Sequence, residues 1–209
     1  MNKIYIVITL ILFTSTYICI GQSKQELSEL LKIDANTFVI KYDKGDFNKD
    51  GFQDYIVIDS IFKGSNDFAD VRIHIYEGLS NNLFVKKCSS GNLTEEFIFN
   101  DNPSIKISEK SVISLFYQSM RHDYELKIAY RKEYKDYIII GSEHHSYGNG
   151  RYSMDISSNY LTKKRIIHES KYNSETDNLD KLPVRTEKIT AKAYSLSNLS
   201  DDNLYSLFE

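Results

Sequence analysis

Apolar and polar positions alternate with a period of two along most of this chain, which is the pattern of half-buried β-strands. In residues 71–75 three apolar side chains fall on one face, and Tyr124, Leu126, Ile128 and Tyr130 repeat the pattern. Turn-like clusters rich in Gly, Asn, Ser and Asp separate such segments. The pattern predicts strands at Thr37–Tyr42, Asp54–Phe62, Asp70–Glu77, Asn82–Lys87, Glu96–Phe99, Ser104–Ser108, Val112–Tyr117, Tyr124–Arg131, Tyr137–Glu143, Tyr152–Ser157 and Leu161–His168.

Short strands at such close spacing predict a mostly β, antiparallel domain, built as a meander, a sandwich or an open barrel. No helical pattern of ordinary length separates them, which argues against a parallel α/β sheet. Residues 23–32 are the exception, because Leu27, Leu30 and Leu31 form one apolar stripe and Ser23 has the spacing of a capping box. We therefore expect one short N-terminal helix.

The C-terminal part of the sequence has weaker signals. The polar segment Lys171–Lys181 is predicted to be a surface loop. Residues 182–209 are expected to pack as a tail against the domain, with a strand at Lys188–Ala193 and a terminal turn at Asn203–Phe208. No internal repeat is visible, so a propeller or solenoid, which needs several copies of one unit, is not expected.

Composition supports a globular β protein. The 209 residues have room for one ordinary domain, or at most two small ones. The 26 Lys and Arg residues against 29 Asp and Glu residues give a net charge of -3, which argues against a general nucleic-acid binder. The chain has 16 Tyr, 11 Phe and no Trp, and these abundant Tyr and Phe residues favour pleated, half-buried surfaces.

The first 21 residues have the pattern of a secretory signal peptide. Lys3 is followed by the apolar run Ile4–Phe13, and Cys19 and Gly21 are small residues at the -3 and -1 positions of a cut. A lipoprotein signal is the rival interpretation, but it needs a small residue before Cys19 and Ile18 is bulky. We expect a soluble exported protein, periplasmic or extracellular, with no membrane span after cleavage and a single β-rich domain at residues 22–209.

Removal of the signal peptide leaves Cys88 as the one cysteine, so the exported chain has no internal disulfide. We expect Cys88 to have a buried packing role, because the residues beside it form no catalytic signature. A metal ion is then the obvious candidate for any additional stabilisation of the fold.

The segment Asp46–Asp54 has the form D-x-N-x-D-G-x-x-D, which predicts a calcium loop. Calcium takes six to eight oxygen ligands, and alternate positions of a tight loop point their side chains inward. Gly51 permits the sharp reversal of the backbone. The predicted metal ligands are Asp46, Asn48, Asp50, Asp54 and the carbonyl oxygen of Phe52. The alternative is a solvated turn without a metal ion.

Two families of metal loops begin in this way. An EF-hand requires Glu at its twelfth position, where this chain has Val57, and the following Tyr55–Ile58 is typical of a strand rather than a helix. The segment Gly45–Ile58 instead resembles the calcium loop of FG-GAP and VCBS-type repeats, which connects β-strands. A looser resemblance over residues 37–168 is to small exported bacterial proteins with one such loop. It implies calcium, export and a β fold, but no activity, because those relatives are mostly of unknown function.

Glu143-His144-His145 is the other candidate for chemistry. An acid and two histidines at a strand end suit zinc binding or acid–base catalysis. Adjacent strand residues point to opposite faces, so His144 and His145 should not converge without a bulge. A third ligand would have to come from a distant histidine, namely His74, His122 or His168. We expect a surface or packing role, and name this strand end with Tyr147 and Arg151 as the first candidate for a site beyond the loop.

The preferred functional hypothesis is therefore an exported β-rich binding or interaction module in which calcium has a structural role. Its partner would be an unknown protein or a cell-surface glycan, and no catalytic residue is assigned. The alternative is an extracytoplasmic hydrolase that uses the Glu143-His144-His145 strand end. A third possibility is a remnant repeat protein whose loop binds metal weakly. A hydrolase should gather these groups in a concave pocket, whereas a binding module should expose a tyrosine-rich patch.

Overall fold

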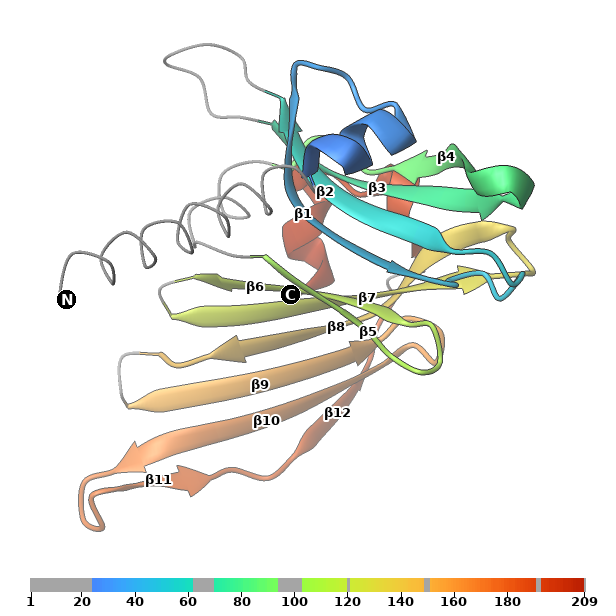
Figure 1. Ribbon diagram of the computed structural model, residues 1–209. Helices are drawn as coiled ribbons and strands as arrows, with labels where there is room; N and C mark the ends of the chain where they lie inside the picture. Colours follow the sequence, from blue (N-terminus) through green and yellow to red (C-terminus); the bar gives the residue numbers. More distant parts are fainter. Residues whose placement is uncertain are drawn as a thin grey trace, which may run out of the picture.

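Two antiparallel sheets of unequal size make up most of the chain (Figure 1). The prediction of a mostly β, antiparallel fold is confirmed. The computed structural model describes residues 24–61, 70–93, 103–119, 121–148, 151–190 and 193–208. The predicted signal peptide and the predicted strand at Glu96–Phe99 lie outside these residues.

The small sheet has the strand order β1-β2-β3-β4, and consecutive strands form antiparallel hairpins. Its strands are β1 (Thr37–Gly45), β2 (Asp54–Ile61), β3 (Asp70–Leu79) and β4 (Leu83–Ser89), and the 3-10 turn η1 (Ser80–Asn82) joins the last two. Strand β2 is buried from Asp54 to Asp59. Its apolar run is covered on both sides, since Ile56 and Ile58 belong to the main core while Tyr55 and Val57 pack toward the N-terminal helix.

Residues 24–31 form the predicted N-terminal helix, which lies on the outer face of the small sheet (Figure 1). Leu27 and Leu31 are buried there beside Val39, Val57 and other apolar side chains. Leu30 is 42 % exposed, so the prediction that it belongs to the same buried stripe is wrong. Leu27 and Leu31, one helical turn apart, face the sheet, whereas Leu30 points away from it.

The large sheet continues the hairpin pattern, with β5 at one edge and β11 at the other. Its strands are β5 (Ser104–Ile107), β6 (Ile113–Ser119), β7 (His122–Arg131), β8 (Asp136–Ser146), β9 (Tyr152–Asn159), β10 (Lys164–Asn173), β11 (Asn178–Lys181), β12 (Arg185–Lys188) and β13 (Tyr194–Ser195). Strand β12 also pairs with β10, and β13 pairs with β8.

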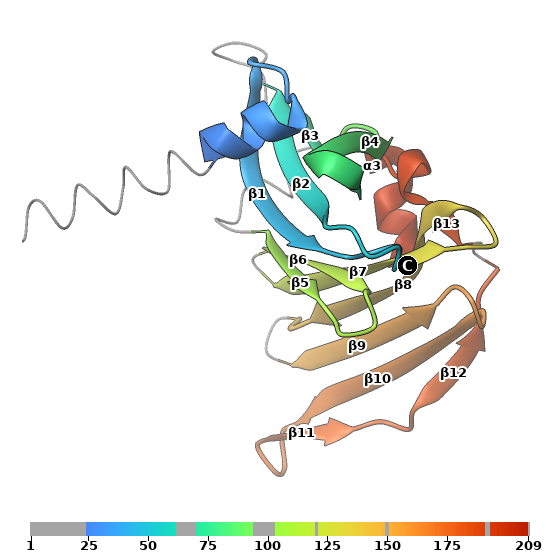
Figure 2. The ribbon, with the colours of Figure 1, turned by 45° about the vertical axis from the view of Figure 1, so that its right-hand side comes forward.

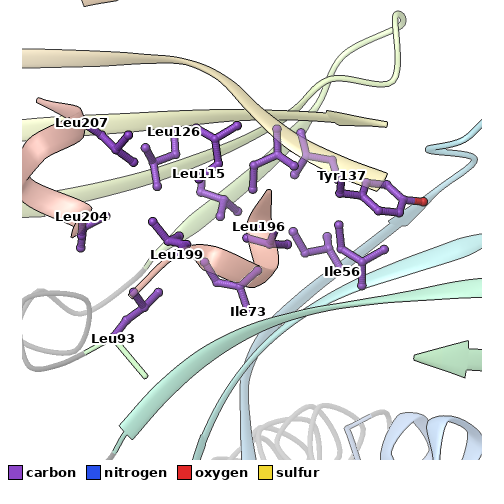
Figure 3. Close-up of a cluster of buried hydrophobic side chains, with 14 of the residues drawn as sticks. Ile56, Ile73, Leu93, Leu115, Leu126, Tyr137, Leu196, Leu199, Leu204 and Leu207 are labelled. Carbon is purple, nitrogen blue, oxygen red and sulfur yellow. The ribbon is translucent and has the colours of Figure 1, made fainter. Parts of the chain in front are cut away.

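The C-terminal segment fills the space between the sheets. It consists of η2 (Leu196–Asn198), α3 (Asp201–Leu204) and η3 (Tyr205–Leu207). Figure 2 shows these short helices beside β4 and the large sheet. Figure 3 shows their leucines pointing toward apolar side chains of both sheets. Leu196, Leu199, Leu204, Leu207 and Phe208 all belong to the main buried cluster. The expected tail is therefore part of the core.

Three predictions near the C-terminus are wrong. The strand expected at Lys188–Ala193 is instead β12, at Arg185–Lys188. The polar segment Lys171–Lys181 is not a loop, because it completes β10, turns and forms β11. Its backbone pairing is independent of side-chain polarity, and Asn173 Nδ2 donates to Asp180 Oδ2 (2.6 Å) across the hairpin. The strand predicted to begin at Leu161 begins at Lys164 instead. The Asn159 side chain accepts the N–H groups of residues 161 and 162 and so forms the preceding turn.

Cys88 has the expected packing role in the core. It is 7 % exposed and unpaired among the described residues. Burial, together with the smaller effects of the neighbouring acids Asp136 and Glu77, raises the pKa of its thiol to about 12. The reactive thiolate form is therefore scarce at neutral pH. Within the part of the chain that the structure describes, no helix has the length and apolarity needed to cross a bilayer.

Candidate functional site

The predicted calcium loop connects β1 and β2 at the junction of the two sheets. Phe47 lies in the main core, 2 % exposed, and its N–H donates to Asp54 Oδ2 (2.8 Å). The other oxygen of Asp54 accepts the N–H of Gly78 in β3 (3.0 Å). On the opposite side, Ser111 Oγ donates to the carbonyl of Asp46 (2.8 Å), which ties the loop to the turn between β5 and β6. The loop is thus anchored at both of its ends.

Three of the predicted ligands turn their side chains into the loop. The N–H of Asp50 lies 3.1 Å from Asp46 Oδ1 and 3.0 Å from Asn48 Oδ1, so these two oxygens share one donor. Asp46 Oδ2 accepts the N–H of Gly51 (3.0 Å), and Asn48 Nδ2 donates to Asp50 Oδ2 (2.8 Å). The oxygens of Asp46, Asn48 and Asp50 therefore gather around the same few backbone atoms and are not splayed into solvent.

Backbone conformation explains why glycines occur at and beside this loop. Gly51 has φ of +91°, a region that other residues rarely adopt. Lys49 also has a positive φ, 61°, which fits the tight winding of the loop. Gly78 faces the loop so closely that a Cβ there would lie 2.2 Å from the carbonyl oxygen of Gln53. Strand β3 thus supports the end of the loop through direct backbone contact.

The donor set suits a hard cation, since it consists of carboxylate, amide and carbonyl oxygens. Among the described residues, however, no three His, Cys, Asp or Glu side chains form a metal-holding group. Asp54 differs from the other predicted ligands, because it is fully buried and each of its oxygens already accepts a backbone N–H. Burial raises its pKa, the two N–H bonds lower it, and the nearby charges of Asp50 and Glu77 raise it. Calcium in the loop remains a prediction.

Glu143-His144-His145 lies in the second half of β8, and its two histidines contact different sets of residues. His144 Nε2 lies 3.0 Å from His122 Nδ1, and its ring stacks on Tyr124 at 4.6 Å and meets Phe208 edge-on. Burial lowers the pKa of His144, and the nearby His122 and His145 lower it further. This ring is part of the packing beneath the C-terminal segment.

His145 belongs to a row of polar residues that crosses the sheet. The strand register places it opposite Asp123 of β7 and Asp155 of β9, and Asp155 lies opposite His168 of β10. Side chains directly opposite each other point to the same face. His145 Nδ1 pairs with Asp155 Oδ1, and Tyr147 donates its phenolic hydrogen to Asp123 Oδ2. Acid and imidazole groups therefore alternate along the row.

Glu143 projects from the same face of β8 as His145, two positions away. Lys127 Nζ donates to Glu143 Oε1 at 2.5 Å and lies 4.0 Å from Glu125 Oε2. Ser157 Oγ on β9 also donates to Glu143 Oε1, at 3.3 Å. The acid predicted as a candidate catalytic group is therefore held in place by a lysine and a hydroxyl.

Two adjoining hollows cover this face of the large sheet. One has a volume of about 310 Å³ and the other about 270 Å³, and Phe116, Asp123 and Tyr124 line both of them. We call the combined depression the polar groove; its principal residues are Phe116, Asp123, Glu143, His145, Asp155 and His168. Tyr147 touches the groove through Asp123, whereas Arg151 does not line it.

Few of the described tyrosines are fully exposed. The large exposed tyrosines are Tyr134 and Tyr147, which lie at opposite ends of β8. Most of the other described tyrosines are half-buried, and five are core residues: Tyr55, Tyr76, Tyr117, Tyr137 and Tyr160. Any ligand site on the described surface is therefore better sought in the polar groove.

A buried polar network in the small sheet was missed from the sequence. His74 Nδ1 lies 2.6 Å from Ser89 Oγ, and its Nε2 lies 2.9 Å from Asp59 Oδ2. Arg72 approaches the other Asp59 oxygen at 3.4 Å. His74 and Asp59 are each 1 % exposed. The available signal was that Asp59, Arg72 and His74 interrupt otherwise apolar strands, but only the register brings them together.

No protein-family model, curated protein or solved structure matches this chain.

Proposed function

We propose that this protein is an exported β-rich binding module in which the loop at residues 46–54 takes up calcium in a structural role. One observation carries the metal part of the proposal: side-chain oxygens of Asp46, Asn48 and Asp50 all accept hydrogen bonds from donors within the same tightly wound loop. With the Phe52 carbonyl they supply the oxygen ligands that calcium prefers, and Asp54 is the predicted fifth ligand. Export rests on the signal-like N-terminus, and a binding role rests on the polar groove.

The ion would stabilise the junction of the two sheets. The loop joins β1 to β2, accepts a bond from Ser111 beside β5 and contacts Gly78 in β3 through Asp54. The gathered carboxylates of Asp46 and Asp50 repel each other, and a cation between them offsets that repulsion. Its role is therefore to hold the ends of several strands in one arrangement.

Calcium is expected to raise the melting temperature of the chain comprising residues 22–209. At a concentration 100 times the dissociation constant, a single bound ion adds about 2.7 kcal/mol to the free energy of unfolding. For a chain of this size, that corresponds to a rise of about 5–10 °C. Thermal unfolding followed by circular dichroism in about 5 mM CaCl2, in the same concentration of MgCl2 and in EDTA measures the effect.

Asp50→Ala is the matched test of the site, because Asp50 is exposed and the change removes one ligand without opening the core. Asp43→Ala, in β1 just before the loop, is its control. The calcium-induced rise should be lost in the first variant and kept in the second. Equal melting temperatures of the unsubstituted chain in calcium and in EDTA would refute the metal part of the proposal.

Hydrolysis is a second candidate function, which one observation favours: His145 is paired with Asp155 inside a concave hollow. In this proposal His145 takes a proton from an attacking water molecule, and Asp155 is the positioning residue that orients the ring. A set of p-nitrophenyl esters, phosphates and glycosides tests it. We expect activity that falls at least about 100-fold in His145→Ala and is unchanged in Thr186→Ala on β12. No activity above the buffer rate on any of these substrates would exclude this candidate.

A further inference from the structure

We propose that the outer face of the large sheet is a self-association surface, and that the partner received by the polar groove is a second copy of this chain. The inference deepens the proposed binding role and rests on it, but it does not depend on calcium in the 46–54 loop. It also competes with hydrolysis in the same hollow, because a second copy would cover His145.

The outer face of the large sheet is the side that points away from the main core. Leu126 and Ile128 of β7 lie in that core, so alternation along the strand turns Asp123, Glu125 and Lys127 outward. The C-terminal segment packs on the core side of the sheet. Figures 1 and 2 show β9 to β12 extending beyond this segment and beyond the small sheet.

The half of the outer face that β7 to β9 form is acidic. The strand register places four carboxylates and one ammonium group together on it, namely Asp123, Glu125, Glu143, Asp155 and Lys127. Arg131 and Asp136 are paired at the far end of β7 and β8 and add no net charge. The side chains of Glu143 and Asp155 are 43 % and 57 % exposed. This half therefore presents an excess of three negative charges beside a hollow that can admit long cationic side chains.

The half that β10 to β12 form is basic. Its outward charged side chains are Lys164, Lys181 and Lys188. The acids of these strands alternate to the opposite face, namely Glu169, Asp180 and Glu187. All three lysines are exposed, and none forms an ion pair or a side-chain hydrogen bond with a described residue. The excess of three positive charges here balances the excess of negative charge on the other half.

A two-fold axis along the strands, between β9 and β10, brings unlike halves together. It lays β8 and β9 of each copy over β10 to β12 of the other, so each acidic half meets a basic half. Packed sheets lie about 10 Å apart, which Glu and Lys side chains bridge from opposite sides. Such a contact uses the same patch twice and closes at two copies, whereas overlap of like halves would place acid against acid.

Apolar side chains on the basic half add to the charge complementarity. Ile166 on β10 and Leu179 on β11 are 41 % and 47 % exposed on this face. Burial of such side chains favours association, and the charges fix its orientation. Four overlapping strands of about eight residues span roughly 19 by 27 Å. That area is at the low end of specific interfaces, so we expect a reversible dimer.

Sedimentation velocity of residues 22–209 tests the proposal, at about 1–200 µM chain in about 50 mM NaCl. We expect the average mass to rise from one to two chain masses, with a dissociation constant of about 1–100 µM. Raising NaCl to about 500 mM should weaken the association at least about fivefold, because salt screens the charges. A chain that stays monomeric throughout, or that associates more tightly in high salt, overturns the proposal.

Paired charge reversals locate the surface. The acid-side variant carries Glu143→Lys with Asp155→Lys, and the base-side variant carries Lys164→Glu with Lys188→Glu. Each alone should associate at least about tenfold more weakly, because like charges then face each other. An equimolar mixture should form a heterodimer about as tightly as the unsubstituted chain associates, because opposite charges then meet again at both contacts. Misfolding of either variant cannot produce this rescue.

Lys132→Glu with Lys171→Glu is the matched control for the base-side variant. It changes the net charge equally, but Lys132 lies in the exposed turn after β7 and Lys171 faces the core side of β10. This control should dimerise like the unsubstituted chain. Because Lys164 and Lys188 are exposed and unpaired, the base-side variant should fold even where the acid-side variant does not. Undiminished dimerisation of the base-side variant, or no heterodimer from two variants with unchanged melting temperatures, refutes this location.

Repeating the sedimentation and the thermal melts in calcium and in EDTA separates this inference from the metal proposal. A dimer whose melting temperature does not respond to calcium overturns the metal proposal alone. A calcium-dependent melting temperature in a chain that stays monomeric overturns self-association alone. Both experiments use the same chain, residues 22–209.

Discussion

A chain that ends at Ala193 is expected not to fold cooperatively. The truncation removes Leu196, Leu199, Leu204, Leu207 and Phe208, each no more than 4 % exposed. Burial of such a side chain contributes about 1.5–3 kcal/mol, so together they contribute about 8–15 kcal/mol. That is as large as the whole stability of a typical domain, about 5–15 kcal/mol. Far-UV circular dichroism during heating should show no cooperative transition for the truncated chain.

Backbone and side-chain hydrogen bonds reinforce this dependence. Gly91 N–H donates to the carbonyl of Leu199 (2.7 Å), which joins the segment after β4 to the C-terminal segment. Ser142 Oγ and Tyr160 Oη both donate to the carbonyl of Leu207, at 2.8 and 2.5 Å. Removing the segment takes the carbonyl acceptors of Leu199 and Leu207 away from these donors, and the lost hydrogen bonds cost further free energy.

A point variant keeps this prediction testable in a folded protein. Leu199→Ala should lower the free energy of unfolding by about 2–5 kcal/mol, the usual cost of such a cavity. Ser197→Ala, an exposed neighbour in η2, is the matched control and should change it by less than about 0.5 kcal/mol. A truncated chain that melts cooperatively near the temperature of the full chain would show that the segment is not part of the core.

Asp59→Ala is expected to lower the free energy of unfolding by about 3–5 kcal/mol, because it breaks a buried charged network by removing one partner. The change leaves His74 buried without its acid and takes from Arg72 the carboxylate oxygen at 3.4 Å. Urea denaturation measures the effect. Glu109→Ala, in the exposed turn between β5 and β6, is the control and should change the value by less than about 0.5 kcal/mol.

A double-mutant cycle separates this network from simple loss of packing. His74→Ala and the double variant with Asp59→Ala complete the cycle, and residues in contact show coupling of about 0.5–3 kcal/mol. Additive effects of the two substitutions would mean that the 2.9 Å contact between them contributes nothing to stability.

Much of the strand content was predictable because its signals are local. The apolar run Tyr55–Ile58 indicated a strand, and β2 forms there, buried on both faces. The Asp–Gly step at Asp50 and Gly51 indicated a tight loop, and the positive φ of Gly51 agrees with it. By contrast, the hairpin of β10 and β11 was missed, since pairing by backbone bonds leaves little trace in the side chains of exposed strands such as Asn178–Lys181.

Of the two candidate sites, the loop at residues 46–54 was predictable from the sequence and the polar groove was not. The gathering of Asp46, Asn48 and Asp50 follows from their spacing within one turn of chain. The polar groove does not, because His145 and Asp155 belong to different strands. Their pairing depends on the register of β8 against β9. Alternation along β8 showed that neighbouring side chains face opposite ways, but it did not show which residues would stand across from them.

The sequence by itself determined that the chain forms antiparallel strands and that residues 46–54 wind into a loop with inward oxygens, because side-chain periodicity and turn chemistry act over a few residues. Only the tertiary structure decided that the C-terminal leucines enter the core, that Asp59 and His74 meet, and that acids and histidines line one groove. These features depend on strand register and on packing between segments far apart in the chain, which no local pattern specifies.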